Sequence, residues 1–231
     1  MAVGINKVYN KVLAIANKEQ RGYIVPQEFN LFADLAQLEI FEQYFYDKNQ
    51  FMRVHGNDSE YSDIIHNLNE KIAVFERTTS IQTNGQITAN DFYRLGTVIY
   101  NGVEVQEVQQ DELLYMNQSP LITPTETRPV YTRSASSTGI QIIGAPTIVQ
   151  GNMTCTYIKK PTKPEWGYVV INDRAMYDGD TSVTTNFELH ESEETELVYK
   201  ILKLAGVSMK RQDLSTAGQG LESSQIQQEK Q

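Results

Sequence analysis

The stretch Val98-Ile99-Tyr100-Asn101-Gly102-Val103-Glu104-Val105 decides the class of fold that we expect. β-branched and aromatic residues stand on both sides of an Asn-Gly pair, which is the strongest short-range signal for a type I′ β-hairpin turn. Further strands are predicted at 129–133, 140–143, 153–159 and 166–171, and a short helix at 111–117. The sequence therefore predicts a β-rich subdomain over residues 78–186.

Helical patterns flank this β-rich segment on both sides. In the first 77 residues, apolar side chains recur at steps of three and four, the spacing of one helix face, and they predict three helices there. Another helix is predicted from Glu191 to Ala205, and Gly206 is expected to end it. We therefore expect an α+β fold, in which a helical bundle formed by residues 1–77 and 187–231 carries an inserted antiparallel β-subdomain.

The second of these helices, over residues 27–46, is apolar on two nearly opposite sides. One stripe consists of Leu31, Leu35, Leu38, Phe45 and Tyr46, and the other of Phe29, Ala33, Ala36, Ile40 and Tyr44. Both faces are expected to be buried, and two interpretations stay open. The helix is the centre of a small bundle, or its second face contacts another chain. On the latter interpretation, the candidate subunit-interface residues of this helix are Phe29, Ile40 and Tyr44.

The C-terminal segment, residues 212–231, is rich in Gln, Ser and Glu, with Leu214, Leu221 and Ile226 as its apolar anchors. Such sparse anchors bury too little apolar area to offset roughly 1 to 2 kcal/mol of backbone entropy per ordered residue. We expect this tail to be mobile in the monomer and to become ordered on contact with a sister subunit or another protein. Leu214, Leu221 and Ile226 are therefore further candidate interface residues, and deletion of the tail is expected to leave the stability of the fold almost unchanged.

Composition and charge restrict the classes of function. The chain has 231 residues and a net charge of -9 at pH 7, which disfavours a protein that grips nucleic acid, because such affinity rests on Lys and Arg. Cys155 is the single cysteine and is expected to be a small buried residue of a strand. The three histidines form no spaced pair, and no phosphate-binding glycine loop or catalytic-serine elbow occurs. We expect no catalytic residues, no metal and no cofactor.

Four acids, Glu191, Glu193, Glu194 and Glu196, open the last predicted helix. Paired carboxylates are the catalytic groups of glycoside hydrolases, so a hydrolase that acts on cell-wall glycan through this cluster is one hypothesis. Acids in a first helical turn are more often a solvated cap that complements the helix dipole. The second interpretation is favoured.

Two parts of the chain resemble structural proteins of short-tailed bacteriophages. Residues 17–30, which include Tyr23-Ile24-Val25-Pro26, and residues 36–41 are similar to the N-terminal helical pair of those proteins. Residues 91–98, the Asn-Gly pair, and residues 119–125 and 157–161 are similar to their central β-region. The likeness spans most of the chain in the same order, and the nearest family is that of the neck or ring proteins of crAss-like phages, which stack beneath the portal vertex.

The resemblance implies a non-enzymatic virion protein that forms a ring in the neck, connects the capsid portal to the tail and lines part of the DNA ejection conduit. Implied partners are the chain itself as a cyclic homo-oligomer of about twelve copies, the portal protein, and other neck or tail proteins. DNA is expected to pass without specific binding, and no membrane is involved. The resemblance also implies that the protein is assembled in the host cytoplasm and is located in the virion. The alternative is another virion component, such as a tail, fibre-attachment or cargo protein.

Overall fold

The structure is a computed structural model of the chain, and it divides into two compact units. One unit joins residues 1–74 to 161–231, and the other comprises residues 75–160. The structure describes residues 3–16, 24–53, 59–82, 85–133, 139–144, 152–180, 182–208 and 212–229. The α+β class is confirmed, and the β-rich insertion ends near residue 160 instead of 186.

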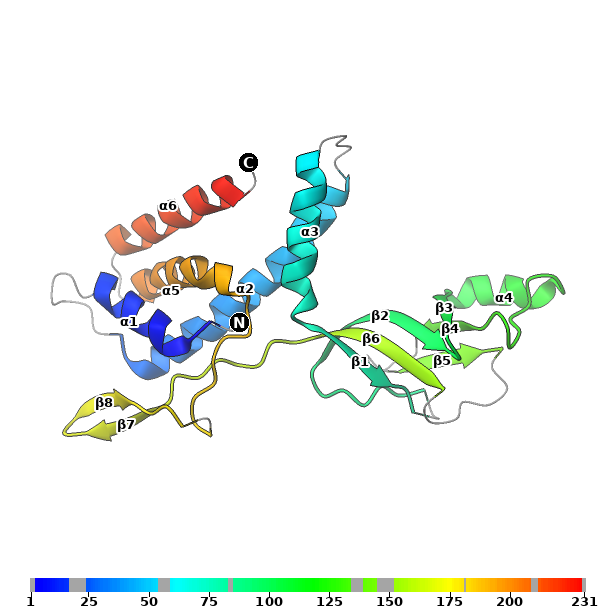
Figure 1. The fold of residues 1–231 in the computed structure, drawn as a ribbon, viewed down its shortest axis with the longest axis horizontal. Coiled ribbons are helices and arrows are strands. Elements are labelled where there is room, and N and C mark those ends of the chain that lie inside the picture. The colour runs from blue at the N-terminus through cyan, green and yellow to red at the C-terminus, as the bar shows by residue number, and fades with distance from the viewer. Residues whose placement is uncertain are drawn as a thin grey trace. The chain divides into compact units, whose positions relative to one another are not determined.

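The first unit, called the helical unit below, contains the four helices that the sequence pattern predicts, a further helix at residues 212–229 and a small β-hairpin (Figure 1). Its elements are α1 (Ile5–Ala16), α2 (Pro26–Arg53), α3 (Ser59–Ala73), β7 (Tyr168–Ile171), β8 (Arg174–Tyr177), the short 3-10 helix η1 (Glu191–Glu193), α5 (Glu194–Ser208) and α6 (Gln212–Glu229). Helix α5 contacts α1, α2 and α6. It continues through Gly206, which was expected to end it, because these packing contacts outweigh the roughly 1 kcal/mol that a glycine costs inside a helix.

Helix α2 buries one side and not both. Phe29, Ile40 and Tyr44 are buried inside the chain, where α2 packs against α3 and α5. Leu31 and Leu35 on the opposite side are exposed. Within the single chain the helix is therefore not the centre of a bundle that covers both its faces, and contact of the second face with another chain stays a prediction. In this conformation Phe29, Ile40 and Tyr44 are core residues, so they do not offer the exposed surface that an interface with another subunit requires.

The hairpin β7–β8 belongs to the helical unit because Trp166 fixes its base to α1 and α2. The ring of Trp166 is buried, with its centroid 4.1 Å from that of Tyr9 and 5.8 Å from those of Tyr168 and Tyr177. The backbone N–H of Trp166 also donates to Asn30 Oδ1 at 2.9 Å. These contacts explain why the boundary between the two units precedes the hairpin.

The second unit, called the β unit below, is built on a six-stranded sheet in the order β1-β6-β2-β3-β4-β5. The strands are β1 (Glu76–Ser80), β2 (Phe92–Tyr100), β3 (Val103–Glu107), β4 (Val130–Arg133), β5 (Ile140–Ile143) and β6 (Met153–Lys159), and α4 (Gln110–Gln118) follows β3. The sheet is mixed, because β3 and β4 pair in parallel while the other pairs are antiparallel. A parallel pair needs a long connection, and the segment that contains α4 supplies it.

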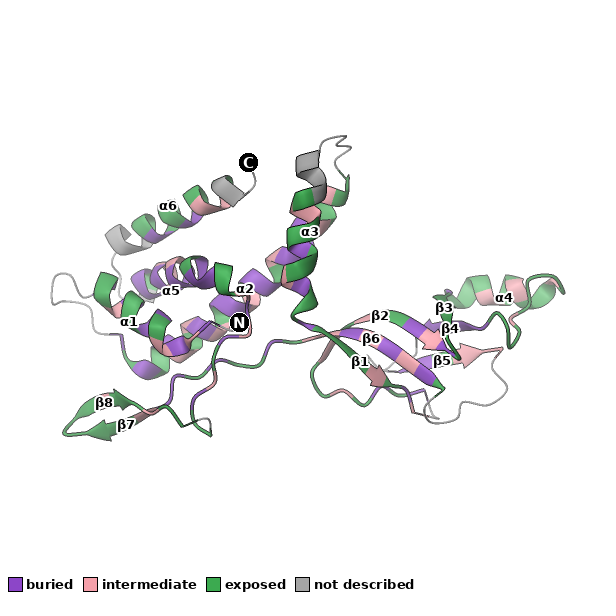
Figure 2. Ribbon diagram, in the orientation of Figure 1, coloured by how far each residue is buried: buried purple, intermediate pink, exposed green. Residues whose placement is uncertain are grey.

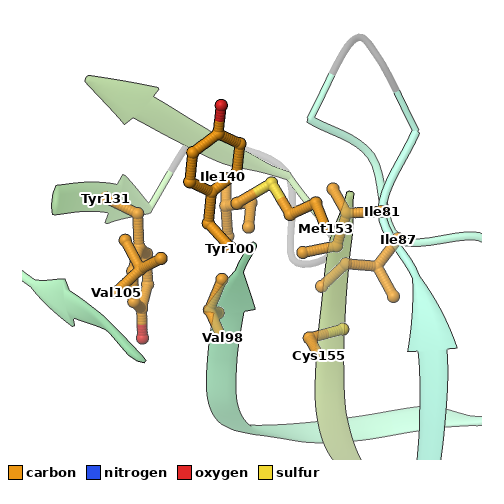
Figure 3. Packing of buried hydrophobic residues seen from close by; sticks show 9 residues of the cluster. All are labelled: Ile81, Ile87, Val98, Tyr100, Val105, Tyr131, Ile140, Met153 and Cys155. Carbon is orange, nitrogen blue, oxygen red and sulfur yellow. The ribbon is translucent and has the colours of Figure 1, made fainter. Parts of the chain in front are cut away.

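The predicted hairpin lies at the centre of this sheet. Tyr100 pairs with Val103 across the two-residue turn, and Asn101 and Gly102 have φ values of 49° and 81°, as a type I′ turn requires. One face of the sheet forms the core of the β unit, with Met153 among Tyr100, Ile81 and Ile87 (Figure 3). Cys155 is buried there as predicted, and burial raises the pKa of its thiol to about 11.

Candidate interaction surfaces and the buried ionic cluster

The C-terminal tail forms helix α6, which packs against α5. The expectation of a tail that is mobile in the monomer is therefore wrong for this structure. Leu221 is exposed, Ile226 is half-buried, and the side chain of Leu214 lies outside the described part of the chain. Leu221 is thus not what anchors α6, and the contacts described next hold this helix.

Helix α6 is held by a cluster of charged side chains in the helical unit. Lys200 of α5 is only 2% exposed, and its Nζ lies 2.9 Å from Glu222 Oε1 of α6. The same Nζ is 3.3 Å from Glu39 Oε1 and 3.5 Å from Glu196 Oε1. Lys203 Nζ contacts the second oxygen of Glu222 at 3.0 Å. We refer to these five residues as the Lys200 cluster.

The charges of the Lys200 cluster stabilise one another against the cost of burial. Burial alone lowers the pKa of Lys200, but the hydrogen bond to Glu222 and the charges of Glu196, Glu222 and Glu39 outweigh it and raise the pKa above 10.5. Burial likewise raises the pKa of Glu222, but the hydrogen bonds from Lys200 and Lys203 hold it below 4.5. Both groups therefore remain charged near neutral pH.

A close backbone approach accompanies the ionic contacts between α5 and α6. Gly218 of α6 is buried, and a Cβ atom placed on it would lie 3.0 Å from the backbone nitrogen of Lys203. This distance is shorter than ordinary van der Waals contact, so any larger residue would require the backbone of Lys203 to move by a few tenths of an ångström. The docking of α6 could not be predicted from the few apolar side chains of residues 212–231, because a glycine and a glutamate make these contacts.

Glu193, Glu194 and Glu196 are buried and do not form a solvated cap, contrary to the favoured interpretation, whereas Glu191 is exposed. Glu193 is buried, and its Oε1 lies 2.6 Å from Lys71 Nζ of α3. Glu194 is buried too, and each of its oxygens lies 2.6 Å from a lysine of α1, Lys7 or Lys11. These acids therefore connect α5 to α1 and α3.

This pairing gives no support to the hydrolase hypothesis. A glycosidase needs one carboxyl group with a raised pKa that can act as general acid. The hydrogen bonds from Lys11 and Lys7 instead lower the pKa of Glu194. Its charge is used to join helices.

A cavity of about 390 Å³ lies in the helical unit among α2, α3, the η1 region and α6. Its lining includes Asp47, Phe51, Leu68, Lys71, His190 and Ile226. Lys71 is engaged with Glu193, and His190 Nδ1 accepts a hydrogen bond from the backbone N–H of Ser192. Lys71 and His190 thus already serve internal contacts. Ile226, a candidate interface residue, lines part of this cavity.

One face of the hairpin β7–β8 is exposed and mostly apolar. In this antiparallel pair Val169 lies opposite Met176, and Ile171 lies opposite Arg174, so the four side chains share one face. All four are exposed, as the green hairpin in Figure 2 shows, and Met176 is 54% exposed. We call these four residues the hairpin outer face.

The exposed side of α2 carries a second surface on the same unit. Leu31, Leu35, Glu42 and Tyr46 are separated by four, seven and four residues, so they follow one face of the helix. All four are exposed, and Leu35 is 55% exposed. We call them the α2 outer stripe. Sequence reasoning found its apolar members but assigned the interface to the opposite stripe, because periodicity alone does not say which of two apolar faces the chain itself covers.

The β unit has an exposed apolar surface of its own at α4 and the loop that follows. Leu114, Tyr115 and Ile122 are exposed there, and Leu121 is 92% exposed (Figure 2). None of the residues of α4 is buried. We call these four residues the α4 surface.

Among the residues that the structure describes, no group of three or more His, Cys, Asp and Glu side chains is placed to hold a metal ion. No helix in the described ranges is long and apolar enough to cross a lipid bilayer.

Comparison with protein-family models and with curated proteins found no match. The exposed apolar surfaces described above are typical of sites that contact another macromolecule.

Proposed function

We propose that this protein is a structural component of a bacteriophage virion, a subunit of a ring in the neck below the portal. In this role it connects the portal to the tail and forms part of the conduit through which DNA is ejected. Its partners are about twelve copies of itself, the portal protein and neighbouring neck or tail proteins. It is not an enzyme and uses no cofactor.

The observation that carries the proposal is the presence of two different exposed apolar surfaces on the helical unit, the hairpin outer face and the α2 outer stripe. A ring of identical subunits is closed by head-to-tail contacts, and each subunit must then offer two complementary surfaces that are unlike each other. Exposed apolar side chains that gather on one element are typical of sites that contact another protein.

The remaining features suit the same role. The α4 surface lies on the other unit, and it is suited to a further protein above or below the ring. The net charge of -9 repels the phosphates of passing DNA, so a wall of this composition does not hold the genome during ejection.

The proposal is tested on the purified full-length chain by native mass spectrometry and by electron microscopy of negatively stained particles. We expect a closed cyclic oligomer with one dominant copy number and a central opening. A chain that remains monomeric at every concentration, or that forms open filaments, would contradict the proposed ring.

A further inference from the structure

We propose that the ring is closed by the hairpin outer face of one copy, which docks on the α2 outer stripe of the next copy. This inference rests on the proposed function and names the surfaces that make the subunit contact. The occupant of the stripe is thus a second copy of this chain.

The hairpin needs a partner for physical reasons. It has only two strands, of four residues each, and a two-stranded sheet is at best marginally stable in water without a covering element. Trp166 covers its base through Tyr168 and Tyr177, which lie on one face. The outer face, with Val169, Ile171 and Met176, is left to solvent in the single chain.

The α2 outer stripe offers a matching surface in shape and chemistry. Leu31 and Leu35 lie one turn apart and both are exposed, so they form a short apolar ridge. A flat β-face laid on such a ridge buries apolar side chains on both partners. Burial of this kind contributes about 25 cal/mol for each Å² of apolar surface removed from water.

Charge complementarity selects this pairing. Arg174 is the single charged member of the hairpin outer face, and it is exposed. Glu42 lies within the α2 outer stripe, and Glu28 lies near its beginning, both exposed. An arginine from one copy therefore meets carboxylates of the next, which adds specificity and orientation to the apolar contact.

The two surfaces are held in a fixed relation, as ring closure requires. The backbone N–H of Trp166 donates to Asn30 Oδ1 at 2.9 Å, and Asn30 directly precedes Leu31 in α2. The base of the hairpin is thus attached to the helix that carries the stripe. Because both surfaces belong to one compact unit, every copy is related to the next by the same rotation, and the assembly closes into a ring when that rotation divides a full turn without a rise along the axis.

The first test uses Met176→Asp on the hairpin and Leu35→Asp on the stripe in the full-length chain. Each variant is expected to abolish the ring seen by native mass spectrometry and to leave the thermal melting curve of the monomer nearly unchanged, because both side chains are exposed. Leu121→Asp is the matched control, since it places the same charge at an exposed apolar residue of the other unit, and it is expected to keep the ring.

Mixing the two variants gives a sharper result. A Met176→Asp copy keeps an intact α2 outer stripe, and a Leu35→Asp copy keeps an intact hairpin outer face, so these two surfaces can still bind each other. The remaining hairpin and the remaining stripe of that pair each carry the new aspartate, so no third copy can be added. We expect a dimer with one copy of each variant and no larger species. A contact that does not join these two surfaces gives no such dimer, and that outcome would overturn the inference.

A charge exchange tests the ionic contact. Arg174→Glu and Glu42→Arg are each expected to weaken the ring, and the double variant is expected to recover it, because the two opposite charges then meet again across the subunit boundary. If the wild type forms a ring and these variants do not alter it, the inference fails while the proposed function stands. If the wild type itself does not assemble, both fail.

Discussion

Lys200 is buried in the helical unit and surrounded by the carboxylates of Glu39, Glu196 and Glu222, which come from α2, α5 and α6. A buried charge is tolerated only when partners replace its water, so each carboxylate that approaches Lys200 also fixes the helix that carries it. This side chain therefore helps to determine where α6 lies on α5. Nothing in the local sequence marks it, because its partners are four residues away at the nearest and 161 at the farthest.

Replacing Lys200 by Met should lower the free energy of unfolding by roughly 3 kcal/mol, because buried carboxylates lose their cation. Lys203→Met is the matched control. Lys203 contacts the same Glu222 but is about one-third exposed, and its loss should cost less than about 1 kcal/mol. Urea unfolding of both variants measures the difference, and equal effects would show that the burial of Lys200 has no special importance.

Acid should loosen α6 through Glu222. The pKa of this carboxyl is lower in the folded chain than its ordinary value of 4.5, so its contribution to stability is fully present above pH 4.5 and is lost as the pH falls through the lowered value. The urea midpoint of the wild type is expected to hold above pH 4.5 and to drop as the pH is lowered below that value. Glu222→Gln removes this part of the pH dependence, and a variant that keeps the full acid response would contradict the role of Glu222.

Among the elements, the two hairpin turns show what local sequence predicts and what it does not. Asn101-Gly102 has the favoured type I′ pair, and the strands around it form as predicted. Asn172-Asp173 makes a similar turn with φ values of 49° and 59°, but its signal is weaker and β8 was not predicted. Strand β1 was missed as well, because its sequence is polar and mostly exposed. Periodicity thus found the elements with a clear apolar pattern.

Helix α6 depends on the glycine that faces α5. Gly218→Leu should push α6 away from the backbone of Lys203 and cost about 1 to 3 kcal/mol, the usual range for overpacking. Gly220→Leu is the matched control, because nothing lies within 4 Å of a Cβ at that position, and it should raise helix stability by up to about 1 kcal/mol. Hydrogen exchange of the α6 amides separates the two variants, and equal protection in both would contradict the close packing of α6 on α5.

The two sides of α2 should respond in opposite ways to the same substitution. Ile40 is 1% exposed, so Ile40→Asp buries an unpaired charge, and the monomer should lose several kcal/mol of stability. Leu31→Asp, on the exposed side, should leave the melting curve of the monomer nearly intact. Thermal melting beside analytical sedimentation measures both effects. A stable, unassembled Ile40→Asp monomer would restore Ile40 to the interface.

In the whole molecule, the chain forms two units, and the β unit is inserted into the helical one as the sequence pattern predicts. The position of the second boundary was not predictable, because the contacts of Trp166 with Tyr9 and Asn30 join residues 136 or more positions apart. The burial of the candidate interface residues Phe29, Ile40 and Tyr44 was not predictable for a related reason. Which apolar stripe of α2 is covered, and whether the tail docks, depends on long-range contacts that periodicity does not contain.

The localisation and copy number of the chain in the phage particle test the central claim most directly. Antibody labelling of intact particles, with quantitative mass spectrometry against the portal protein, measures both. We predict label at the single vertex that holds the portal and about twelve copies of the chain in each particle, as one ring requires. Label spread over the capsid or at the ends of the fibres, or the absence of the chain from the particle, would contradict the proposed place in the neck.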